Sequence, residues 1–337
     1  MRTAVVLWAL LLTVTLGGAQ ATRPQRTVLH APVAGPEWPA PPSQTRIRFL
    51  RSITPAAVRG KPSFLARIGR VLFGKGEEPQ MTQPYGVAAG PDGRIYVADT
   101  FGHAIHVYDL ESPDYSSIKV DGESLIGVGT AKGLLFVTDS VSGRLMCLDR
   151  RGRTVWTRGP RDGFARPTGL AVGVDRLYVV DTLQHRVVTV SFTGEILGTF
   201  GAHGSGAGQL NFPTNVTQGA DGHVFVTDSM NFRVQVFDRD GRFLRTFGQL
   251  GDGSGDLDKP KGVAVDSEGH VYIVEGLHDV VQIFDARGVL LLSFGESGSG
   301  DGQFWLPTGI AIVNDIIYVS DSANRRIQLF EYVKETR

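Results

Sequence analysis

The sequence predicts an all-β protein, and two observations lead to that prediction. Of its 337 residues, 43 are glycine, 9% are aromatic and 20% are charged. This composition is typical of short strands joined by many tight turns, because glycine adopts the positive φ angles that turns need. In addition, one short phrase recurs along the chain: an aromatic residue, an aliphatic residue, any residue and an acid. Such internal repetition indicates an architecture of repeated units.

The phrase occurs six times, and its acids are separated by 40, 42, 47, 47 and 46 residues. This period fits a propeller blade of four short strands, so the sequence predicts six blades. Each acid is expected where a strand ends and a turn begins. The six acids are Asp99, Asp139, Asp181, Asp228, Glu275 and Asp321.

A Pro-x-Gly step precedes most of these acids by 14 or 15 residues and predicts the innermost strand of each blade. Proline lacks an N–H group and therefore suits the first position of a strand, and glycine two residues later permits close backbone approach around a central channel. Two repeats deviate from the pattern. Leu125 replaces the proline in the second repeat, and Asn215 replaces the glycine in the fourth.

The segments after two of the acids, DSMNFRVQVF at 228–237 and DSANRRIQLF at 321–330, resemble the NHL repeat. Recurrent glycine-rich linkers that precede the Pro-x-Gly steps add to this likeness. The resemblance covers about residues 79–333, and we assign residues 79–337 to the repeats. It implies a six-bladed β-propeller of the kind found in secreted bacterial NHL-repeat proteins.

The sixth repeat lacks a fourth strand, and an N-terminal segment could supply it. Residues 47–53 are similar to residues 241–247, the expected outer strand of the fourth repeat. Three strands from the C-terminus and one from the N-terminus would then close the ring without an open edge. Between this strand and the first repeat, Phe64, Ile68 and Leu72 recur at helical spacing, so residues 63–73 predict a short amphipathic helix. Both elements fall in residues 45–78.

Residues 1–21 predict a signal peptide, with Arg2, an apolar run at 4–16 and a small-residue cleavage site that ends at Ala21. The run is too short to span a bilayer, so we expect export to the periplasm or beyond, with no transmembrane segment after cleavage. A Pro-rich arm follows at 22–44. Residues 22–78 are rich in Lys and Arg, whereas the repeats are acidic. The arm either packs on the propeller or docks an anionic partner, and nucleic acid is not expected as a ligand.

The repeat acids are expected to serve the architecture, although a calcium site or a catalytic ring of carboxylates is the alternative. An acid at the start of a turn can accept backbone N–H groups, and an arginine five residues later can pair with it across the hairpin. Glu275 has no such arginine, so the fifth repeat is the least typical. The expected partners in four other repeats are Arg144, Arg186, Arg233 and Arg326.

Metal and cofactor motifs are sparse in the sequence. Cys147 is the only cysteine, which excludes an intramolecular disulfide and cysteine-based zinc sites. Some NHL propellers are peptidyl-amidating lyases, and the resemblance to them would imply zinc held by channel-facing histidines. The inner-strand starts of this chain carry no histidine. We therefore expect no catalytic set, no metal site and no cofactor, with calcium left open.

The mouth of the channel remains as the candidate binding site. Residues at the start of the inner strands should line it, and a polar lining with one cation and one aromatic ring could hold a small polar ligand or water. The candidate residues are Tyr85, Thr168, Thr214, Asn215, Lys261 and Thr308.

These observations favour a non-enzymatic exported module that binds or scaffolds a protein or envelope partner. Resemblance to bacterial NHL proteins found beside multihaem cytochrome systems makes a cytochrome, and hence electron transfer, one candidate partner. The alternative is a calcium-dependent hydrolase or lyase whose site lies at the channel mouth.

Overall fold

The computed structural model describes residues 35–55, 80–110, 112, 114–251 and 253–334. The predicted signal peptide and the predicted helix at 63–73 lie outside these residues, as does the first part of the Pro-rich arm. Within the described residues, no helix is long and apolar enough to cross a membrane.

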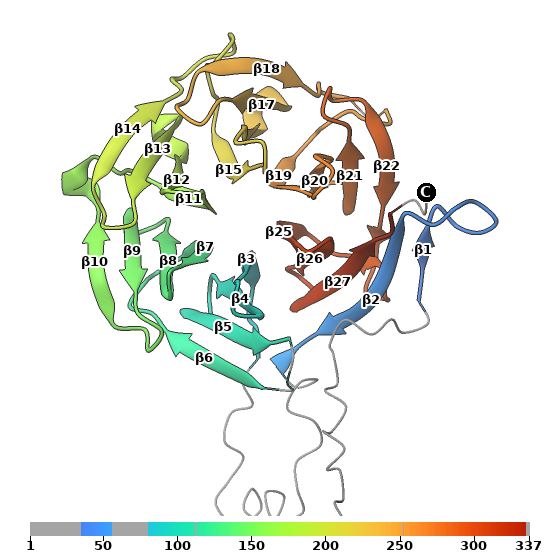
Figure 1. The fold of residues 1–337 in the computed structure, drawn as a ribbon, viewed down its shortest axis with the longest axis horizontal. Coiled ribbons are helices and arrows are strands. Elements are labelled where there is room, and N and C mark those ends of the chain that lie inside the picture. The colour runs from blue at the N-terminus through green and yellow to red at the C-terminus, as the bar shows by residue number, and fades with distance from the viewer. Residues whose placement is uncertain (1–34, 56–79, 111, 113, 252, 335–337) are drawn as a thin grey trace, which may run out of the picture.

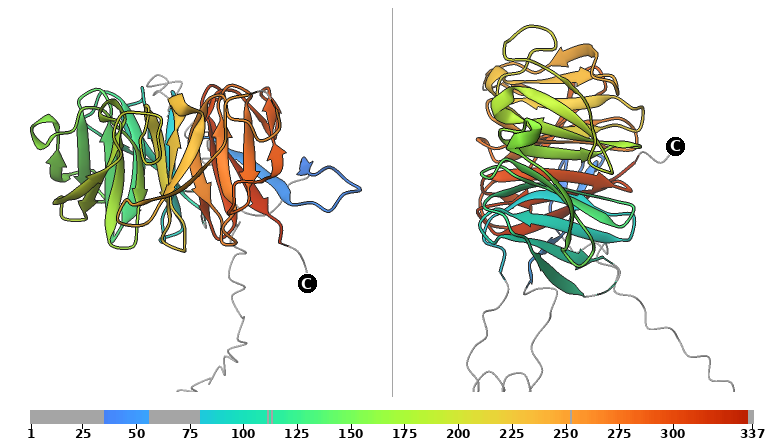
Figure 2. Two further views of the ribbon diagram at one scale, coloured as in Figure 1. Left: turned by 90° about the horizontal axis from the view of Figure 1, so that it is seen from above. Right: turned by 90° about the vertical axis from the view of Figure 1, so that its left-hand side faces the viewer.

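Six antiparallel sheets surround a central channel in the described part of the chain (Figure 1), which confirms the predicted all-β six-bladed propeller. The blades lie side by side in a ring that Figure 2 shows from its edges. In chain order the first five blades are β3 (Pro84–Ala89), β4 (Arg94–Asp99), β5 (Ala104–Asp109) and β6 (Tyr115–Lys119); β7 (Leu125–Ala131), β8 (Leu134–Asp139), β9 (Arg144–Leu148) and β10 (Thr154–Arg158); β11 (Pro167–Val172), β12 (Arg176–Asp181), β13 (Arg186–Ser191) and β14 (Ile196–Phe200); β15 (Pro213–Gln218), β16 (Val224–Asp228), β17 (Arg233–Phe237) and β18 (Phe243–Phe247); and β19 (Pro260–Val265), β20 (Val271–Glu275), β21 (Val280–Phe284) and β22 (Leu290–Phe294).

The sixth blade combines the two ends of the chain. Its sheet has the order β1-β2-β27-β26-β25, in which β25 (Pro307–Val313) is innermost, followed by β26 (Ile316–Asp321) and β27 (Arg326–Tyr332). The outer strand β2 (Ile47–Ile53) pairs antiparallel with β27, from Ile47 opposite Tyr332 to Ile53 opposite Ile327. Figure 1 shows this N-terminal strand in blue beside the red C-terminal strands.

The described part of the Pro-rich arm contacts the propeller. The short strand β1 (Glu37–Trp38) pairs with β2 at the outer edge of the sixth blade. The Trp38 ring lies 5.7 Å from the Phe294 ring of the fifth blade and 5.9 Å from the Phe330 ring of the sixth. The arm therefore covers apolar surface at the joint between these two blades.

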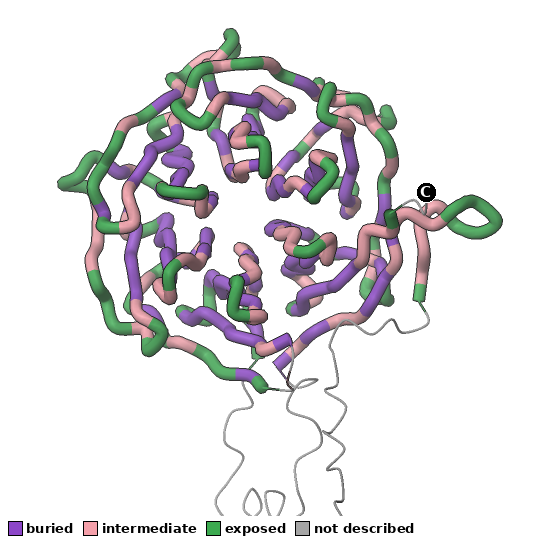
Figure 3. The backbone as a smooth tube through the Cα atoms, in the orientation of Figure 1, coloured by how far each residue is buried: buried purple, intermediate pink, exposed green. Residues whose placement is uncertain are grey.

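The core lies between neighbouring blades. Figure 3 shows buried residues concentrated on the inner and middle strands, with exposed residues along the outer ring. One apolar cluster unites Leu50 and Ile53 of β2 with Ile95 and Val97 of the first blade. The N-terminal strand thus completes the sixth sheet and also packs against the first blade.

A matched pair of leucines tests this packing. Leu50 is 0% exposed, whereas Leu244, at the equivalent position of β18, is 42% exposed. We expect Leu50→Ala to lower the free energy of unfolding by about 2–5 kcal/mol, because it leaves a cavity in the core. Leu244→Ala should change the same quantity by only about 0.5 kcal/mol. Urea denaturation measures both, and equal effects would show that β2 does not pack as described.

Candidate functional site

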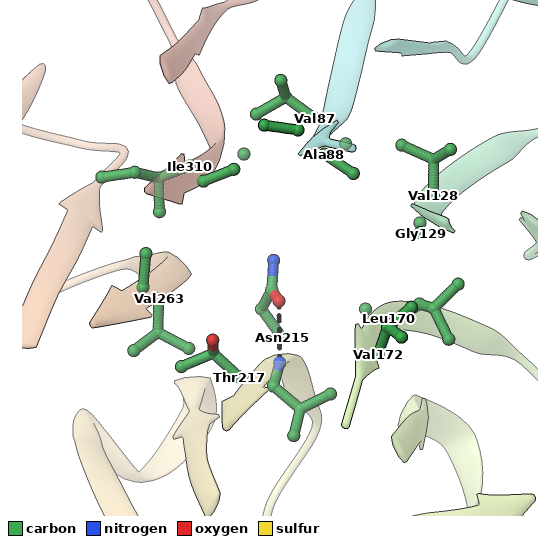
Figure 4. A pocket seen from close by; sticks show the side chains of 18 of the residues that line it. Val87, Ala88, Val128, Gly129, Leu170, Val172, Asn215, Thr217, Val263 and Ile310 are labelled. Carbon is green, nitrogen blue, oxygen red and sulfur yellow. Dashed lines mark hydrogen bonds between the residues drawn. The ribbon is translucent and has the colours of Figure 1, made fainter. Parts of the chain in front are cut away.

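The central channel is lined by the inner strands and has a mainly aliphatic wall. Its cavity of about 300 Å³ is bordered by Val87, Val128, Val263 and Ile310, among others. Asn215, one of the predicted site residues, points into this space in Figure 4. Its side-chain oxygen accepts the N–H of Val216 at 2.7 Å. Polar side chains of Thr130, Thr217 and Gln218 also line the channel below its mouth.

Close approach of the inner strands explains the glycines of the Pro-x-Gly steps. A Cβ atom placed on Gly86 would lie 2.2 Å from the backbone oxygen of Ile126, and one on Gly309 would lie 2.2 Å from the oxygen of Tyr85. No side chain fits at such distances, so the third position of these strands has to be glycine. In β15 the strand pairing shifts one residue earlier than in the other blades, at the point where Asn215 replaces glycine.

Three of the predicted mouth residues are threonines whose hydroxyls face the next blade. Thr168 Oγ1 donates to the backbone oxygen of Thr214 at 3.2 Å, and Thr308 Oγ1 donates to that of Tyr85 at 3.2 Å. Thr214 Oγ1 is 3.3 Å from the backbone oxygen of Lys261. These hydroxyls therefore join neighbouring inner strands.

Hydroxyls in the turns after the repeat acids add a second set of contacts between blades. Each donates to the carbonyl of the first inner-strand residue of the next blade, which would otherwise lie unpaired at the joint. Four blades show this contact: Thr100 to Leu125, Thr182 to Pro213, Ser229 to Pro260 and Ser322 to Pro84.

The fifth blade replaces this hydroxyl with a lysine from its own inner strand. Gly276 follows Glu275 and has no side chain, and a Cβ there would lie 2.4 Å from Cε of Lys261. The Lys261 ammonium donates to the Pro307 carbonyl at 3.3 Å, as a turn hydroxyl does elsewhere. Burial lowers the pKa of Lys261, and the charge of Lys259 lowers it further.

The repeat acids are all 0% exposed and bind the backbone before the inner strand. Asp228 accepts the N–H of Asn211 at 2.6 Å, and Glu275 accepts that of Lys259 at 2.6 Å. The arginine partners expected from the sequence approach their acids at 3.5, 3.5, 2.8 and 2.7 Å, in the pairs Arg144–Asp139, Arg186–Asp181, Arg233–Asp228 and Arg326–Asp321. Both oxygens of each of these carboxylates thus contact protein groups.

The pKa values of two of these acids shift in opposite directions. Burial alone would raise the pKa of Asp139, but hydrogen bonds from Ser142 and from the N–H groups of Glu123 and Ser124 outweigh it, so the pKa lies below its ordinary value. At Glu275 burial dominates over three backbone hydrogen bonds, and the pKa is raised. Burial therefore leaves Glu275 with a carboxyl group that holds its proton more tightly than in the unfolded chain.

A cavity of about 320 Å³ opens at the mouth of the channel. Four residues predicted from the sequence line it: Tyr85, Thr168, Thr214 and Lys261. Arg166, Phe212 and Lys259, which the sequence reasoning missed, line it as well. Burial raises the pKa of the Tyr85 phenol, and the charge of Arg166 opposes part of that shift. The missed residues share one signal: each immediately precedes the proline that starts an inner strand. Aligning the repeats one residue further upstream would have found them.

Among the described residues, no group of three or more His, Cys, Asp or Glu side chains could hold a metal ion. The expectation that the protein binds no cofactor, with calcium left open, stays a prediction.

Comparisons with known proteins agree with this geometry. A family model described as a 6-bladed beta-propeller matches residues 211–282, and the NHL-repeat model matches residues 81–108. The chain is a six-bladed β-propeller with NHL repeats. A search of curated protein sequences finds no match for this propeller.

Three solved structures show the same fold at low sequence identity. An auxiliary nutrient binding protein from Bacteroides thetaiotaomicron is 14% identical, with a TM-score of 0.60, over 77% of this propeller chain and 71% of the other. A gluconolactonase from Xanthomonas campestris is 15% identical, with a TM-score of 0.59, over 75% and 87%. A nidogen/laminin complex contains a chain that is 18% identical, with a TM-score of 0.53, over 68% and 85%.

The exchange of roles in the fifth blade can be tested by a double-mutant cycle. Lys261→Thr removes the donor to Pro307 and should lower the free energy of unfolding by about 1–3 kcal/mol. Adding Gly276→Ser to that variant supplies the hydroxyl found in other blades and should restore most of the loss. Urea denaturation of both single variants and the double variant gives the coupling energy. Additive effects would contradict the exchange.

The raised pKa of Glu275 predicts a pH dependence of stability. The folded state binds this proton more tightly than the unfolded state, so the contribution of Glu275 falls as pH rises from about 4.3, the ordinary glutamate pKa, through the raised value. We expect the stability of Glu275→Gln relative to the natural protein to increase with pH over this window. Asp139→Asn is the control, because a lowered pKa gives a difference that is flat from pH 5 to 8 and is lost only in stronger acid. A flat difference for Glu275→Gln as well would show that burial does not dominate there.

Proposed function

We propose that this propeller is an exported, non-enzymatic binding module that holds a protein partner against the face on which the channel mouth opens, here called the mouth face. The observation that carries the proposal is a ring of apolar side chains two residues after the repeat acids. These side chains are 49–63% exposed: Phe101, Val141, Leu183, Met230 and Leu277. Each lies in the turn between the second and third strands of its blade.

The ring continues in the sixth blade with side chains from another segment. Ala323 takes the equivalent turn position there, and Trp305 and Leu306, just before β25, are 57% and 49% exposed. Large apolar side chains that recur on one face of a molecule are typical of an interaction surface. Trp is also among the residues that contribute most to binding in protein interfaces.

The turns that carry these side chains are held in place before any partner arrives. In three blades the buried acid accepts a turn N–H group: Asp99 from Gly102, Asp139 from Ser142 and Glu275 from Leu277. In the fourth and sixth blades the acid accepts the side-chain amide of a turn asparagine instead. A surface ordered in advance loses less conformational entropy on binding. The scaffold therefore supports a rigid docking face rather than a surface that folds on contact.

The identity of the partner is a separate proposal. The predicted signal peptide supports export and an envelope location. A multihaem cytochrome is one candidate partner, which can be titrated against the purified protein. The fold likeness to a gluconolactonase keeps the calcium-dependent hydrolase as the alternative. Elemental analysis and a thermal shift with calcium distinguish the two, because only the alternative needs bound metal.

Capture from an envelope extract with the full-length tagged protein tests the docking face. We expect one partner in a stoichiometric amount with the natural protein, and at least about tenfold less with the double variant Phe101→Asp, Leu277→Asp, which places charge on the apolar ring. Val174→Asp is the matched control, since Val174 is 90% exposed in the turn at the opposite end of the third blade's inner strand. Equal capture by all three proteins, or no partner with any of them, would reject the proposed function.

A further inference from the structure

We propose that the cavity at the channel mouth binds a carboxylate carried on an apolar group, such as the free C-terminus of a chain that ends in an apolar residue. This inference rests on the proposed function, because the cavity opens at the centre of the mouth face. Its size of about 320 Å³ lies at the lower end of the range for ligand pockets, which fits a single side chain with its terminal group.

The cavity is positively charged on one side. Arg166, Lys259 and Lys261 come from the third and fifth blades, and Asp258 is the one carboxylate among the residues that line it. The side chains of Arg166 and Lys259 are exposed and form no hydrogen bond or ion pair with the described residues. The ammonium group of Lys261 has three N–H donors, and one of them binds the Pro307 carbonyl.

Beyond Asp258, the acids nearest to Lys261 are Asp279 and Glu275, whose charges oppose only part of the lowering of its pKa. The repeat acids are fully buried, and their oxygens already accept hydrogen bonds from backbone and side-chain groups. Burial is the main cause of the lowered pKa of Lys261, and the like charge of the neighbouring Lys259 lowers it further. An anion bound between them would relieve this repulsion, and a guanidinium such as that of Arg166 donates two parallel hydrogen bonds to a carboxylate.

Apolar and aromatic side chains complete the wall. Phe212 and Met230 belong to the fourth blade, between the two that supply the cations, and Ile126 and Tyr85 lie on the second and first blades. A hydrated inorganic anion would gain little from these groups. An apolar substituent next to the carboxylate would bury against them, and this contact favours an organic acid over phosphate.

The buried groups of the scaffold fix the backbone of each key residue. The N–H of Arg166 donates to Asp181 at 2.8 Å, and that of Lys259 donates to Glu275 at 2.6 Å. Phe212 has no acid at its N–H; it donates instead to Nδ1 of His185 at 3.1 Å, and the two rings lie 4.6 Å apart. The three side chains therefore project from positions that are set before a ligand binds, as a selective site requires.

Isothermal titration of the full chain tests the inference with four probes: a hexapeptide ending in phenylalanine with a free carboxylate, the same peptide as its C-terminal amide, 3-phenylpropionate and inorganic phosphate. We expect the free-acid peptide or phenylpropionate to bind, and the amide and phosphate to bind at least about tenfold more weakly. Tighter binding of the peptide than of phenylpropionate identifies a chain terminus as the source, and the reverse order identifies a small organic acid. Equal binding of acid and amide, or of phosphate and phenylpropionate, would overturn the inference.

Two single variants test whether the probe binds in this cavity. Lys259→Gln and Arg166→Gln should each weaken binding of the free-acid probe about tenfold or more, because each removes a charge-assisted hydrogen bond. Arg161→Gln, an exposed arginine that does not line the cavity, should leave it unchanged. Unaltered binding in both cavity variants would also overturn the inference. The apolar-ring variant Phe101→Asp, Leu277→Asp, whose two residues do not line the cavity, reports on the proposed function instead. Loss of partner capture there, with no carboxylate effect at Lys259, would reject the inference and leave the docking face standing.

Discussion

The propeller depends on one interaction that every blade repeats: a fully buried carboxylate at the end of the second strand binds the backbone just before the inner strand. The chain reaches the inner strand by crossing from the outer edge of the preceding blade, and this crossing would otherwise leave N–H groups unpaired in the interior. A carboxylate offers several lone pairs at one point, so a single side chain can satisfy both the crossing and the turn that follows. Burial of the charge is tolerated because these bonds, and an arginine in four blades, compensate for lost hydration.

The same interaction gives the mouth face its chemistry. Once the backbone is held by the acid, the side chain before the inner-strand proline and the side chain two residues after the acid are free of structural duty. In this chain those two positions hold Arg166, Phe212 and Lys259 around the cavity, and Met230 and Leu277 on the rim. Architecture and recognition are thus divided between adjacent residues of one segment.

Most of the fold could be predicted because its determinants are local and repeated. Each repeated signal depends on the structure of one short segment: the six acids, the Pro-x-Gly steps and the alternating third strands. The similarity between residues 47–53 and 241–247 pointed to the segment that pairs with β27. The site was harder to predict. A threonine at the channel mouth can face a ligand or a neighbouring carbonyl, and the choice for Thr168 and Thr308 is set by the spacing between blades, which no local pattern encodes. Arg166 and Lys259 lie outside the repeated phrase, so a search for repetition passed over them.

The fifth blade shows why departures from a repeat carry information. Three differences occur together there: Glu275 replaces aspartate, Gly276 replaces a hydroxyl residue, and Lys261 replaces the threonine of three other blades. The structure links the last two, because the lysine fills the space next to Gly276 and makes the contact with Pro307 that a turn hydroxyl makes in other blades. A hydroxyl could have made that contact without charge. The lysine adds a cation to the mouth beside Lys259. Burial of this lysine lowers its pKa. The fifth blade thus has a charged group where other blades have a neutral hydroxyl. It is the blade that departs furthest from a purely structural repeat, and its added charge faces the cavity.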